Sequence, residues 1–327
     1  MDTHSLHNFG SVLIAGKKGM VGSGFVRALT TGRWKDLCGG VTAIGRDDVD
    51  LSMQTKVFSC FADIKPDTVV IAAAKVGGID ANRSQPWDFI YDNLCIQTNI
   101  LRAALDTGCR QVIFLGSSCI YPRDSKQPIC EGELLTKPLE MTNQWYAIAK
   151  IAGLKMCQAA NLQFDRDFRC FMPTNLFGIG DHYSLSTSHV IPALLLKFHL
   201  AKVRECESVT VWGSGNPMRE FLYVDDCVDA CLLAASVSCE RFRELTDGES
   251  FLNIGSGFEI SIADLAREVA SVVGYPGQIV FDSSMPDGSP RKIVNNARLE
   301  RLGWKPVVSF HSGLRLAYSD FLKRNLV

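Results

Sequence analysis

Short apolar runs alternate with amphipathic stretches over the first half of the chain. The apolar runs are rich in Val, Ile and Ala, which predicts buried strands, and the stretches between them predict helices. Apolar strands separated by helices are typical of a parallel sheet that helices cover on both faces. We therefore predict an α/β fold. The expected strands are 11–16, 40–45, 67–74, 111–118 and 168–175, and the expected helices are 20–32, 54–65, 89–108 and 144–163.

The pattern changes after Asn175, where the apolar runs become shorter and richer in turn residues. The last expected helix begins with Ser261 and Asp264 in capping-box spacing and ends at Gly274. We predict a second, smaller α/β region that is partly interleaved with the first. The expected domains are 1–175 and 176–327, and the expected elements of the second are helices 188–202 and 261–274 and strands 208–215, 220–224 and 250–255.

The overall composition excludes several classes of protein. Of the 327 residues, 46% are hydrophobic and 21% charged, which is ordinary for a globular chain, and a net charge of -1 gives no support for binding to nucleic acid. The apolar runs are well short of the roughly 20 residues that span a bilayer, and the first residues contain no apolar signal segment. The twelve cysteines are scattered without a C-x-x-C pair, and the histidines lack ligand spacing. We therefore expect a reduced, cytoplasmic enzyme without a metal site or a membrane partner.

Three glycines, Gly16, Gly19 and Gly22, follow the first expected strand and open the first expected helix. Glycine lets such a loop turn sharply and lets backbone N–H groups approach a pyrophosphate at the positive end of the helix. A tight strand-to-helix turn would also explain the glycines, but the strand before them and the helix after them supply the context of a dinucleotide site. We therefore predict a Rossmann-type, doubly wound sheet that binds a dinucleotide.

The end of the second expected strand bears on which dinucleotide binds. An acidic residue at this position would bind a ribose 2′-hydroxyl, whereas an arginine accommodates a 2′-phosphate. Arg46 comes first here, and Lys17 and Lys18 add positive charge inside the glycine loop, while Asp47 favours the hydroxyl. We expect NADP(H).

Tyr146 and Lys150 lie four residues apart on an expected helix and hence on one face of it. A lysine ammonium beside a phenol lowers the pKa of the phenol, so that the tyrosine can pass a proton near neutral pH. Ser117, at the end of an expected strand, can orient a substrate carbonyl. Amphipathic helices produce this tyrosine–lysine spacing by chance, so the prediction of a reductase depends on the combination with the glycine loop.

With these residues, the chain resembles the extended short-chain dehydrogenase/reductase superfamily, and within it the GDP-L-fucose synthase family. The resemblance implies an NADPH-dependent isomerase and oxidoreductase, which epimerises GDP-4-keto-6-deoxy-D-mannose at C3 and C5 and reduces C4 to give GDP-L-fucose. It also implies a homodimer that associates through the helices at 89–105 and 144–160. The segments that carry the resemblance, from Val12 to Lys292, read AAAKVGGIDAN, SSCIYP, YAIAK, MPTNLFG, SHVIPALLLKFHLAK, VWGSGNPMREFLYVDD and PDGSPRK.

The family pattern implies a role for each catalytic side chain. A 4-keto group makes the neighbouring C–H bonds acidic, and epimerisation then needs a base on one face of the sugar ring and an acid on the other. By this pattern Cys119 is the base and His189 the acid, and Tyr146 protonates the C4 oxygen during reduction. A cysteine is commonly a small buried apolar residue, and His189 alone would be a polar residue at a helix start, so both assignments depend on the motifs. The implied catalytic residues are Ser117, Cys119, Tyr146, Lys150 and His189.

Contacts with the cofactor and the GDP-sugar substrate follow from the same resemblance. Arg219 and Lys292 offer cations suited to diphosphate oxygens, and Trp212 would cover the sugar or the guanine. The expected substrate contacts are Lys197, Trp212, Arg219, Asp287 and Lys292. The expected cofactor contacts are Gly16, Lys17, Lys18, Gly19, Met20, Val21, Gly22, Arg46, Ala72, Ala74, Lys150, Pro173, Thr174, Asn175, Leu176 and His189.

Three alternatives share much of this pattern. A nucleotide-sugar 4-epimerase would keep NAD tightly bound and would not need Cys119 and His189 as a base and an acid. A GDP-colitose synthase would share most of the motifs. A nucleotide-binding relative without catalysis would have no need of Ser117, Tyr146 and Lys150 together.

Overall fold

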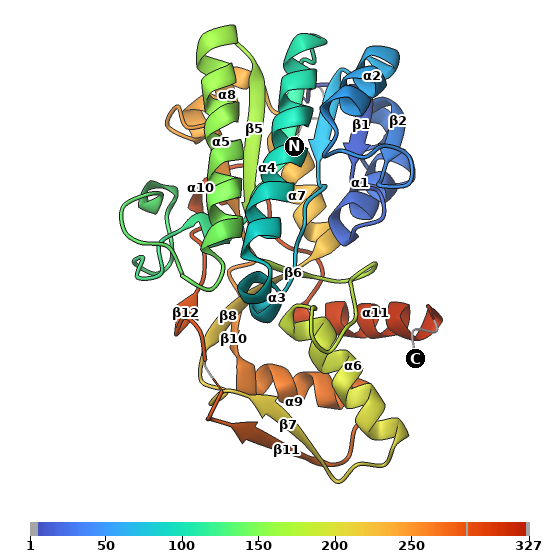
Figure 1. Cartoon of the computed structure of the whole chain (residues 1–327), viewed down its shortest axis with the longest axis vertical. Helices are drawn as coiled ribbons and strands as arrows, with labels where there is room; N and C mark the ends of the chain where they lie inside the picture. Colours follow the sequence, from blue (N-terminus) through green and yellow to red (C-terminus); the bar gives the residue numbers. More distant parts are fainter. Residues whose placement is uncertain (1–5, 286, 325–327) are drawn as a thin grey trace.

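The structure of the chain, a computed structural model, describes residues 6–285 and 287–324 (Figure 1). A parallel sheet of six strands in the order β2-β1-β3-β4-β5-β9 forms its larger half. The predicted α/β fold with a doubly wound parallel sheet is therefore confirmed. β9 comes from the second half of the sequence, so that half also contributes a strand to this sheet. The six strands are β1 (Gly10–Ala15), β2 (Cys38–Ile44), β3 (Thr68–Ile71), β4 (Gln111–Leu115), β5 (Asp167–Pro173) and β9 (Phe251–Ile254).

Helices cover both faces of this sheet. Side chains alternate between the two faces along each strand, so each strand contributes apolar side chains to both cores. In β1, Leu13 joins the core under one layer of helices, while Val12 and Ile14 join the core under the other. The first layer contains α2 (Gln54–Ile64), α4 (Pro86–Asp106) and α5 (Gln144–Phe164), and the second contains α1 (Met20–Thr30) and α7 (Val224–Ser236).

The second region packs around a third apolar core (Figure 1). Its α9 begins as the sequence predicts, with Ser261 Oγ accepting from the Asp264 N–H at 3.0 Å, and ends at Gly274, whose φ of 71° favours glycine. The elements of this region are β6 (Asn175–Phe177), α6 (Val190–Val203), β7 (Ser208–Trp212), β8 (Met218–Tyr223), β10 (Glu259–Ser261), α9 (Ile262–Val273), β11 (Gln278–Asp282), β12 (Arg291–Lys292) and α11 (Phe310–Lys323).

Shorter helices complete the fold. None of the helices in the described ranges is long and apolar enough to cross a membrane. The remaining helices are α3 (Ile79–Ser84), α8 (Cys239–Leu245) and α10 (Ala297–Glu300), and the 3-10 turns are η2 (Lys35–Leu37), η3 (Ser118–Ile120) and η4 (Glu131–Glu133).

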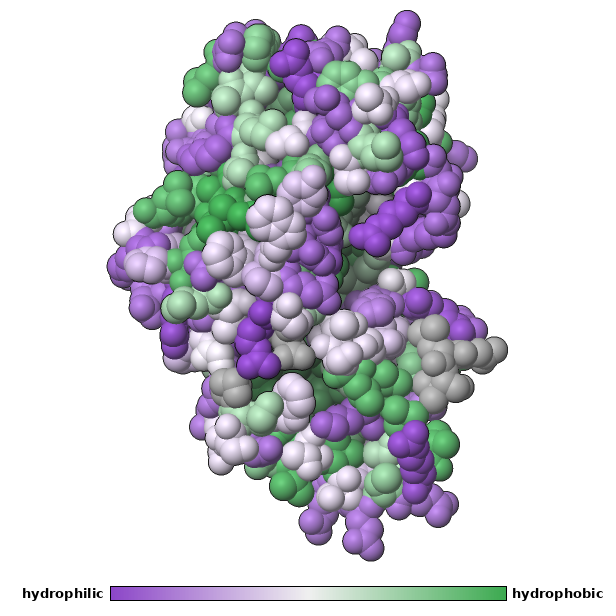
Figure 2. Space-filling view, in the orientation of Figure 1, coloured by the Kyte–Doolittle hydropathy of each residue, from purple (hydrophilic) through white to green (hydrophobic). Residues whose placement is uncertain are grey.

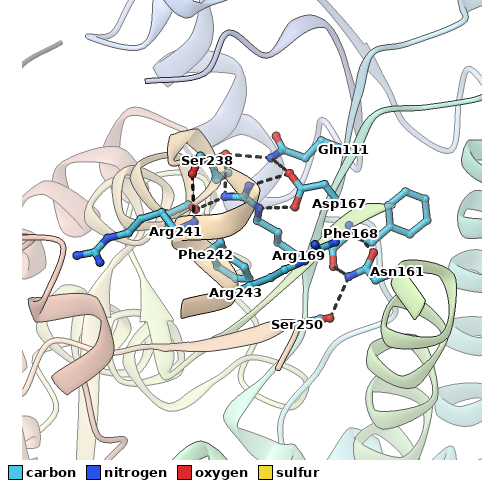
Figure 3. A network of polar contacts seen from close by, with 12 residues as sticks. Gln111, Asn161, Asp167, Phe168, Arg169, Ser238, Arg241, Phe242, Arg243 and Ser250 are labelled. Carbon is cyan, nitrogen blue, oxygen red and sulfur yellow. Dashed lines mark hydrogen bonds and ion pairs between the residues drawn. The ribbon is translucent and has the colours of Figure 1, made fainter. Parts of the chain in front are cut away.

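A buried arginine joins β5 to α7 and α8 at the amino-terminal edge of the sheet (Figure 3). The guanidinium of Arg169 makes two parallel hydrogen bonds to Asp167, at 2.7 and 2.8 Å, and a third, at 2.7 Å, to the Ala234 carbonyl. It also lies over the ring of Phe242, 4.6 Å from the centroid. Breaking such a buried pair by removing one partner destabilises a protein by about 3–5 kcal/mol, so this network is structural.

A cavity of about 640 Å³ adjoins the arginine network. Its charged groups are largely paired with protein groups: Lys155 Nζ donates to Gln158 Oε1 at 2.8 Å, and Arg243 lies 3.2 Å from the Asp165 carboxylate. Because Asp167 opens β5, the cavity lies at the amino ends of the strands. Ligands of doubly wound sheets bind at the opposite edge, so this cavity is not the candidate active site.

Candidate active site

The carboxyl ends of β1 and β3 form the topological switch point of the sheet, where the chain crosses from one side of β1 to the other. The glycine loop lies at this point. Gly16 has a φ of 107°, and a Cβ on it would lie 2.7 Å from Ala73 N, while a Cβ on Gly22 would lie only 2.1 Å from the Gly16 carbonyl oxygen. A Cβ on Gly19 would lie 3.5 Å from the same oxygen, which is an ordinary van der Waals contact. Gly16 and Gly22 therefore keep the backbone close-packed where a pyrophosphate would bind.

Two ion pairs surround the expected ribose site. Lys17 lies 2.7 Å from the Asp48 carboxylate, and Lys18 pairs with Asp47. Arg46 is exposed and makes no hydrogen bond or ion pair with any residue that the structure describes. Asp47 and Asp48 thus form ion pairs with the loop lysines. The guanidinium of Arg46 is left available to bind a 2′-phosphate.

The other expected cofactor residues follow the same edge of the sheet. Ala72 N donates to the Ala15 carbonyl at 3.0 Å, which places the loop after β3 beside the glycine loop. After β5, Thr174 N donates to the Ile254 carbonyl at 2.9 Å and Asn175 Nδ2 to the Glu220 carbonyl at 2.9 Å. This edge faces the second region, and the molecular surface is hollowed between the two halves (Figure 2). The half-buried members of the set are Met20, Val21, Ala74 and Leu176, while Pro173 is buried.

Ser117 and Cys119 lie directly after β4, where the strand gives way to η3. Ser117 is the N-cap of this turn, and its Oγ accepts from Cys119 N at 3.1 Å. Because that bond uses a lone pair, the hydroxyl proton of Ser117 remains for a substrate oxygen. The Cys119 sulfur, which is partly exposed, accepts from Asn143 Nδ2 at 3.3 Å.

Tyr146 and Lys150 lie on α5, which packs against η3. Lys150 is 3% exposed, donates to the Leu115 carbonyl at 2.8 Å and has its Nζ 5.8 Å from the centroid of the Tyr146 ring. Burial lowers the pKa of Lys150 to about 8, so its ammonium is still mostly protonated at pH 7.

The expectation that Lys150 lowers the pKa of Tyr146 is wrong for this arrangement. Burial, with a smaller contribution from Cys119, raises the pKa of Tyr146 well above its ordinary value. The ammonium faces the ring and a backbone carbonyl instead of the hydroxyl. The phenol is therefore held in its protonated form, which suits a proton donor, and the Cys119 thiol is close enough to act on it electrostatically.

His189 is the N-cap residue of α6, and its side chain makes no cap hydrogen bond. The imidazole is exposed, yet the protein mass around it desolvates the charged form and lowers its pKa, with a smaller effect from His182. The preceding residues pack on the loop after β3, since Gly78 N donates to the Thr187 carbonyl at 3.0 Å. His189 thus stands where the nucleotide-binding half meets the second region.

The loop that leads to His189 is also held by α11. Gly180 N donates to Asp320 at 2.9 Å, Arg324 donates to the Asp181 carbonyl oxygen at 2.7 Å, and Tyr183 Oη donates to the Ala317 carbonyl at 3.0 Å. The Asp181 side chain is 6% exposed, and burial raises its pKa to about 7.

The expected substrate residues lie on neighbouring strands of the second region. Lys292 on β12 is the register partner of Arg219 on β8, so the two cationic side chains project from adjacent positions of neighbouring strands. Arg219 also donates to the Met218 carbonyl at 2.8 Å, and burial lowers its pKa. Two adjacent cations that lack a directly bonded carboxylate are suited to a diphosphate.

The other expected substrate residues differ in their exposure and in the hydrogen bonds that they already make. Trp212, at the end of β7, is 58% exposed and offers its ring face. Asp287 accepts from both Ser214 N and Ser214 Oγ, at 2.7 Å each, so its carboxylate already holds the loop after β7. Lys197 donates to the Thr210 carbonyl, and burial lowers its pKa.

The structure therefore brings Ser117, Cys119, Tyr146 and Lys150 together, and none of the described contacts joins His189 to them directly. Sequence reasoning missed Asn143, which contacts the Cys119 sulfur. Its place three residues before Tyr146, at a helix start, is one where asparagine commonly caps the helix, and this would have concealed its contact with a residue on another element. It also missed Gly78, whose contact with the loop before His189 depends on tertiary structure.

Comparison with known proteins agrees with this geometry. Residues 12–243 match the model of the family described as "NAD dependent epimerase/dehydratase family". The match spans the glycine loop, the segment from Ser117 to Lys150 and His189, and it covers well over half of the chain.

Several relatives align with nearly the whole chain. "GDP-L-fucose synthase" from Escherichia coli is 47% identical over 95% of this chain and 96% of its own length. "Putative GDP-L-fucose synthase 2" from Arabidopsis thaliana is 46% identical over 97% of this chain and 93% of its own. Among solved structures, a GDP-L-fucose synthetase from Naegleria fowleri bound to NADP has a TM-score of 0.84 at 26% identity, covering 98% of this chain and 96% of that one.

Proposed function

The chain belongs to the NAD dependent epimerase/dehydratase family, and from this premise we propose that it is an NADPH-dependent GDP-L-fucose synthase. It epimerises GDP-4-keto-6-deoxy-D-mannose at C3 and C5 and reduces the C4 ketone. One observation carries the proposal beyond the likeness to relatives. A partly exposed thiol, Cys119, lies beside the tyrosine and lysine of a reductase, at the carboxyl edge of a dinucleotide-binding sheet.

The epimerisation requires proton removal and proton return on opposite faces of the sugar ring. Cys119, as thiolate, takes a proton from the carbon next to the ketone, and the electron pair of the C–H bond is delocalised onto the ketone oxygen. Ser117 donates its free hydroxyl proton to that oxygen as a hydrogen bond. His189 returns a proton to the other face of the carbon, which inverts it. The sulfur and the imidazole exchange these protons with solvent before the second carbon reacts.

The reduction uses the other half of the same site. NADPH, when bound, supplies the hydride for C4. The residues of this chain hold the substrate and supply the proton for the C4 oxygen. Tyr146, whose burial keeps it protonated, gives its proton to the C4 oxygen and regains one from solvent, while the Lys150 Nζ lies 5.8 Å from the centroid of its ring.

The residues around the glycine loop fit an NADP(H) cofactor. A methyl group on Gly16 or Gly22 would occupy the space that close-packed backbone now holds, so the cradle for the pyrophosphate depends on glycine. Arg46 makes no hydrogen bond or ion pair with the described residues and can bind a 2′-phosphate. Arg219 and Lys292 would bind the diphosphate of the GDP-sugar, and Trp212 would lie against its guanine or sugar.

We further propose a cytoplasmic homodimer that associates through α4 and α5. Trp87 and Tyr91 on α4 stack at 5.6 Å and are 70% and 51% exposed, and Trp145 and Ile148 on α5 are also exposed. Large exposed aromatic and aliphatic groups on adjacent helices are typical of an association surface. A Trp87→Lys variant should sediment as a monomer where the wild-type chain sediments as a dimer.

The function is tested by supplying GDP-4-keto-6-deoxy-D-mannose and NADPH in deuterated water. We expect NADPH to be consumed and NMR of the product to show GDP-L-fucose with deuterium at C3 and C5. Cys119→Ser should largely abolish the deuterium uptake, whereas Tyr146→Phe should leave uptake measurable and slow the reduction. Turnover of the sugar without net NADPH consumption would instead indicate a 4-epimerase.

A further inference from the structure

Asn143 contacts the sulfur of Cys119 from the start of α5 and has no role in the scheme above. Its Nδ2 donates to Cys119 Sγ at 3.3 Å, while its Oδ1 is buried and has no hydrogen-bond partner among the described residues. Buried polar atoms in folded proteins are nearly always paired, so an unpaired amide oxygen next to a reactive thiol calls for an explanation.

Helix capping does not supply that explanation. Asn143 occupies the N-cap position of α5, but its side chain makes no cap hydrogen bond. The amide is directed instead toward a residue 24 positions earlier in the chain. The side chain thus contributes little to α5 itself, and its described hydrogen bond is the one to the sulfur.

We propose that Asn143 is a positioning residue that serves both protonation states of Cys119. This inference rests on the proposed function, in which Cys119 alternates between thiolate and thiol. When Cys119 is a thiolate, the Asn143 N–H donates to the negative sulfur through the contact of 3.3 Å that the structure shows. When the sulfur has taken a proton from the substrate carbon, a half-turn of the amide presents the free Oδ1 to the new S–H. The amide group has both a donor and an acceptor, so the unpaired Oδ1 is explained as the acceptor for the S–H of protonated Cys119.

The two states place different demands on substitutions at this position. Asn143→Asp keeps the size of the side chain and can accept from the thiol, but it offers no N–H and brings a negative charge to the thiolate. Asn143→Ala removes both ends of the amide and opens space beside the sulfur. Loss of a hydrogen bond to a charged group reduces the population of that form by about tenfold or more.

The test is the alkylation of Cys119 by iodoacetamide in the full-length protein without substrate, measured peptide by peptide by mass spectrometry. We expect alkylation of Cys119 to slow by about tenfold in Asn143→Ala and by more in Asn143→Asp. The exposed Cys130 and Cys206 are internal controls and should react at wild-type rates in both variants. Because the space opened by alanine would by itself speed alkylation, slowing in Asn143→Ala isolates the lost N–H donor, whereas Asn143→Asp adds the effect of a negative charge.

Unchanged or faster alkylation of Cys119 in Asn143→Asp would overturn the proposal, and so would equal slowing at Cys119 and the two control cysteines. The proposed function is tested separately by deuterium uptake at C3 and C5 in the same variants. Slow alkylation together with wild-type deuterium uptake would uphold the contact between Asn143 and the sulfur but remove Cys119 as the base.

Discussion

Gly78 lies where the loop after β3 meets the loop that carries His189, and its replacement by alanine should displace His189, the proposed acid, without touching it. A Cβ on Gly78 would lie 2.7 Å from the Ser188 carbonyl oxygen, whereas ordinary van der Waals contact begins at 3.4 Å. The carbonyl must therefore move by about 0.7 Å, the difference between these two distances. The atom that must move is backbone, and it belongs to the residue directly before His189.

The expected effect follows from the tolerance of acid–base catalysis to misplacement. A displacement of about 1 Å in a catalytic group can reduce the rate by roughly 100-fold, so a shift of this size predicts a loss of about 10- to 100-fold in deuterium uptake at the carbon that His189 protonates. Binding of NADPH should change much less, because Gly16, Gly22 and Arg46 are unaffected and His189 is only one of the expected cofactor contacts. The rates come from NMR of the product in deuterated water, and the affinity from fluorescence titration.

A matched control is available in Gly132, where an added Cβ meets nothing within 4 Å. Gly132→Ala should retain wild-type rates and melting temperature, which separates the effect of the Gly78 contact from that of a glycine-to-alanine change in general. Wild-type deuterium uptake by a folded Gly78→Ala variant would refute the reasoning, because it would mean that the loop before His189 can yield without moving the imidazole.

Three further predictions concern the cofactor loop and the buried acid. Gly22→Ala should abolish NADPH binding, because its Cβ would lie 2.1 Å from the Gly16 carbonyl oxygen, whereas Gly19→Ala, with 3.5 Å to the same atom, should bind NADPH nearly normally in a calorimetric titration. Arg46→Ala should raise the KM for NADPH and leave the KM for NADH unchanged, and a parallel rise in both would contradict a 2′-phosphate contact. Burial raises the pKa of Asp181 from 3.8 to about 7, so the folded state holds a proton that the unfolded state has lost between these pH values, and stability declines as pH rises through this window. Asp181→Asn should remove roughly 3 kcal/mol of this decline in urea unfolding measured at pH 4 and pH 7, and equal pH dependence in both proteins would show that Asp181 titrates normally.

The sequence allowed the parallel sheet to be predicted because its strands are continuous apolar runs separated by amphipathic helices. The glycine loop and the neighbourhood of Ser117, Tyr146 and Lys150 followed from the same topology, since strand ends meet at one edge. The division of the chain at residue 175 stays a prediction. What could not be predicted are contacts between distant segments: Asn143 with Cys119, Gly78 with Ser188, and Lys292 beside Arg219. These contacts depend on how loops pack against one another, and the spacing of residues within one segment does not predict that.

The pKa of Tyr146 illustrates the same limit in electrostatic terms. Spacing on a helix placed Lys150 beside the ring, and the cation was expected to favour the phenolate. The structure adds the burial of both groups, which raises the pKa of Tyr146 and lowers that of Lys150, because each charged form loses its hydration. Charge proximity can be anticipated from sequence spacing, whereas desolvation requires knowing what packs around the pair.

The same desolvation constrains how Cys119 and His189 can work as a base and an acid. Desolvation by the surrounding protein lowers the pKa of His189 and so disfavours the imidazolium, whereas the proposed acid must carry a proton. A thiolate with an imidazolium and a thiol with a neutral imidazole have the same net charge and differ by one proton moved between the groups. Each epimerisation converts the first pair into the second, so the site does not accumulate charge during the reaction. Under the proposed function, proton exchange with solvent has to restore the charged pair before the next carbon reacts.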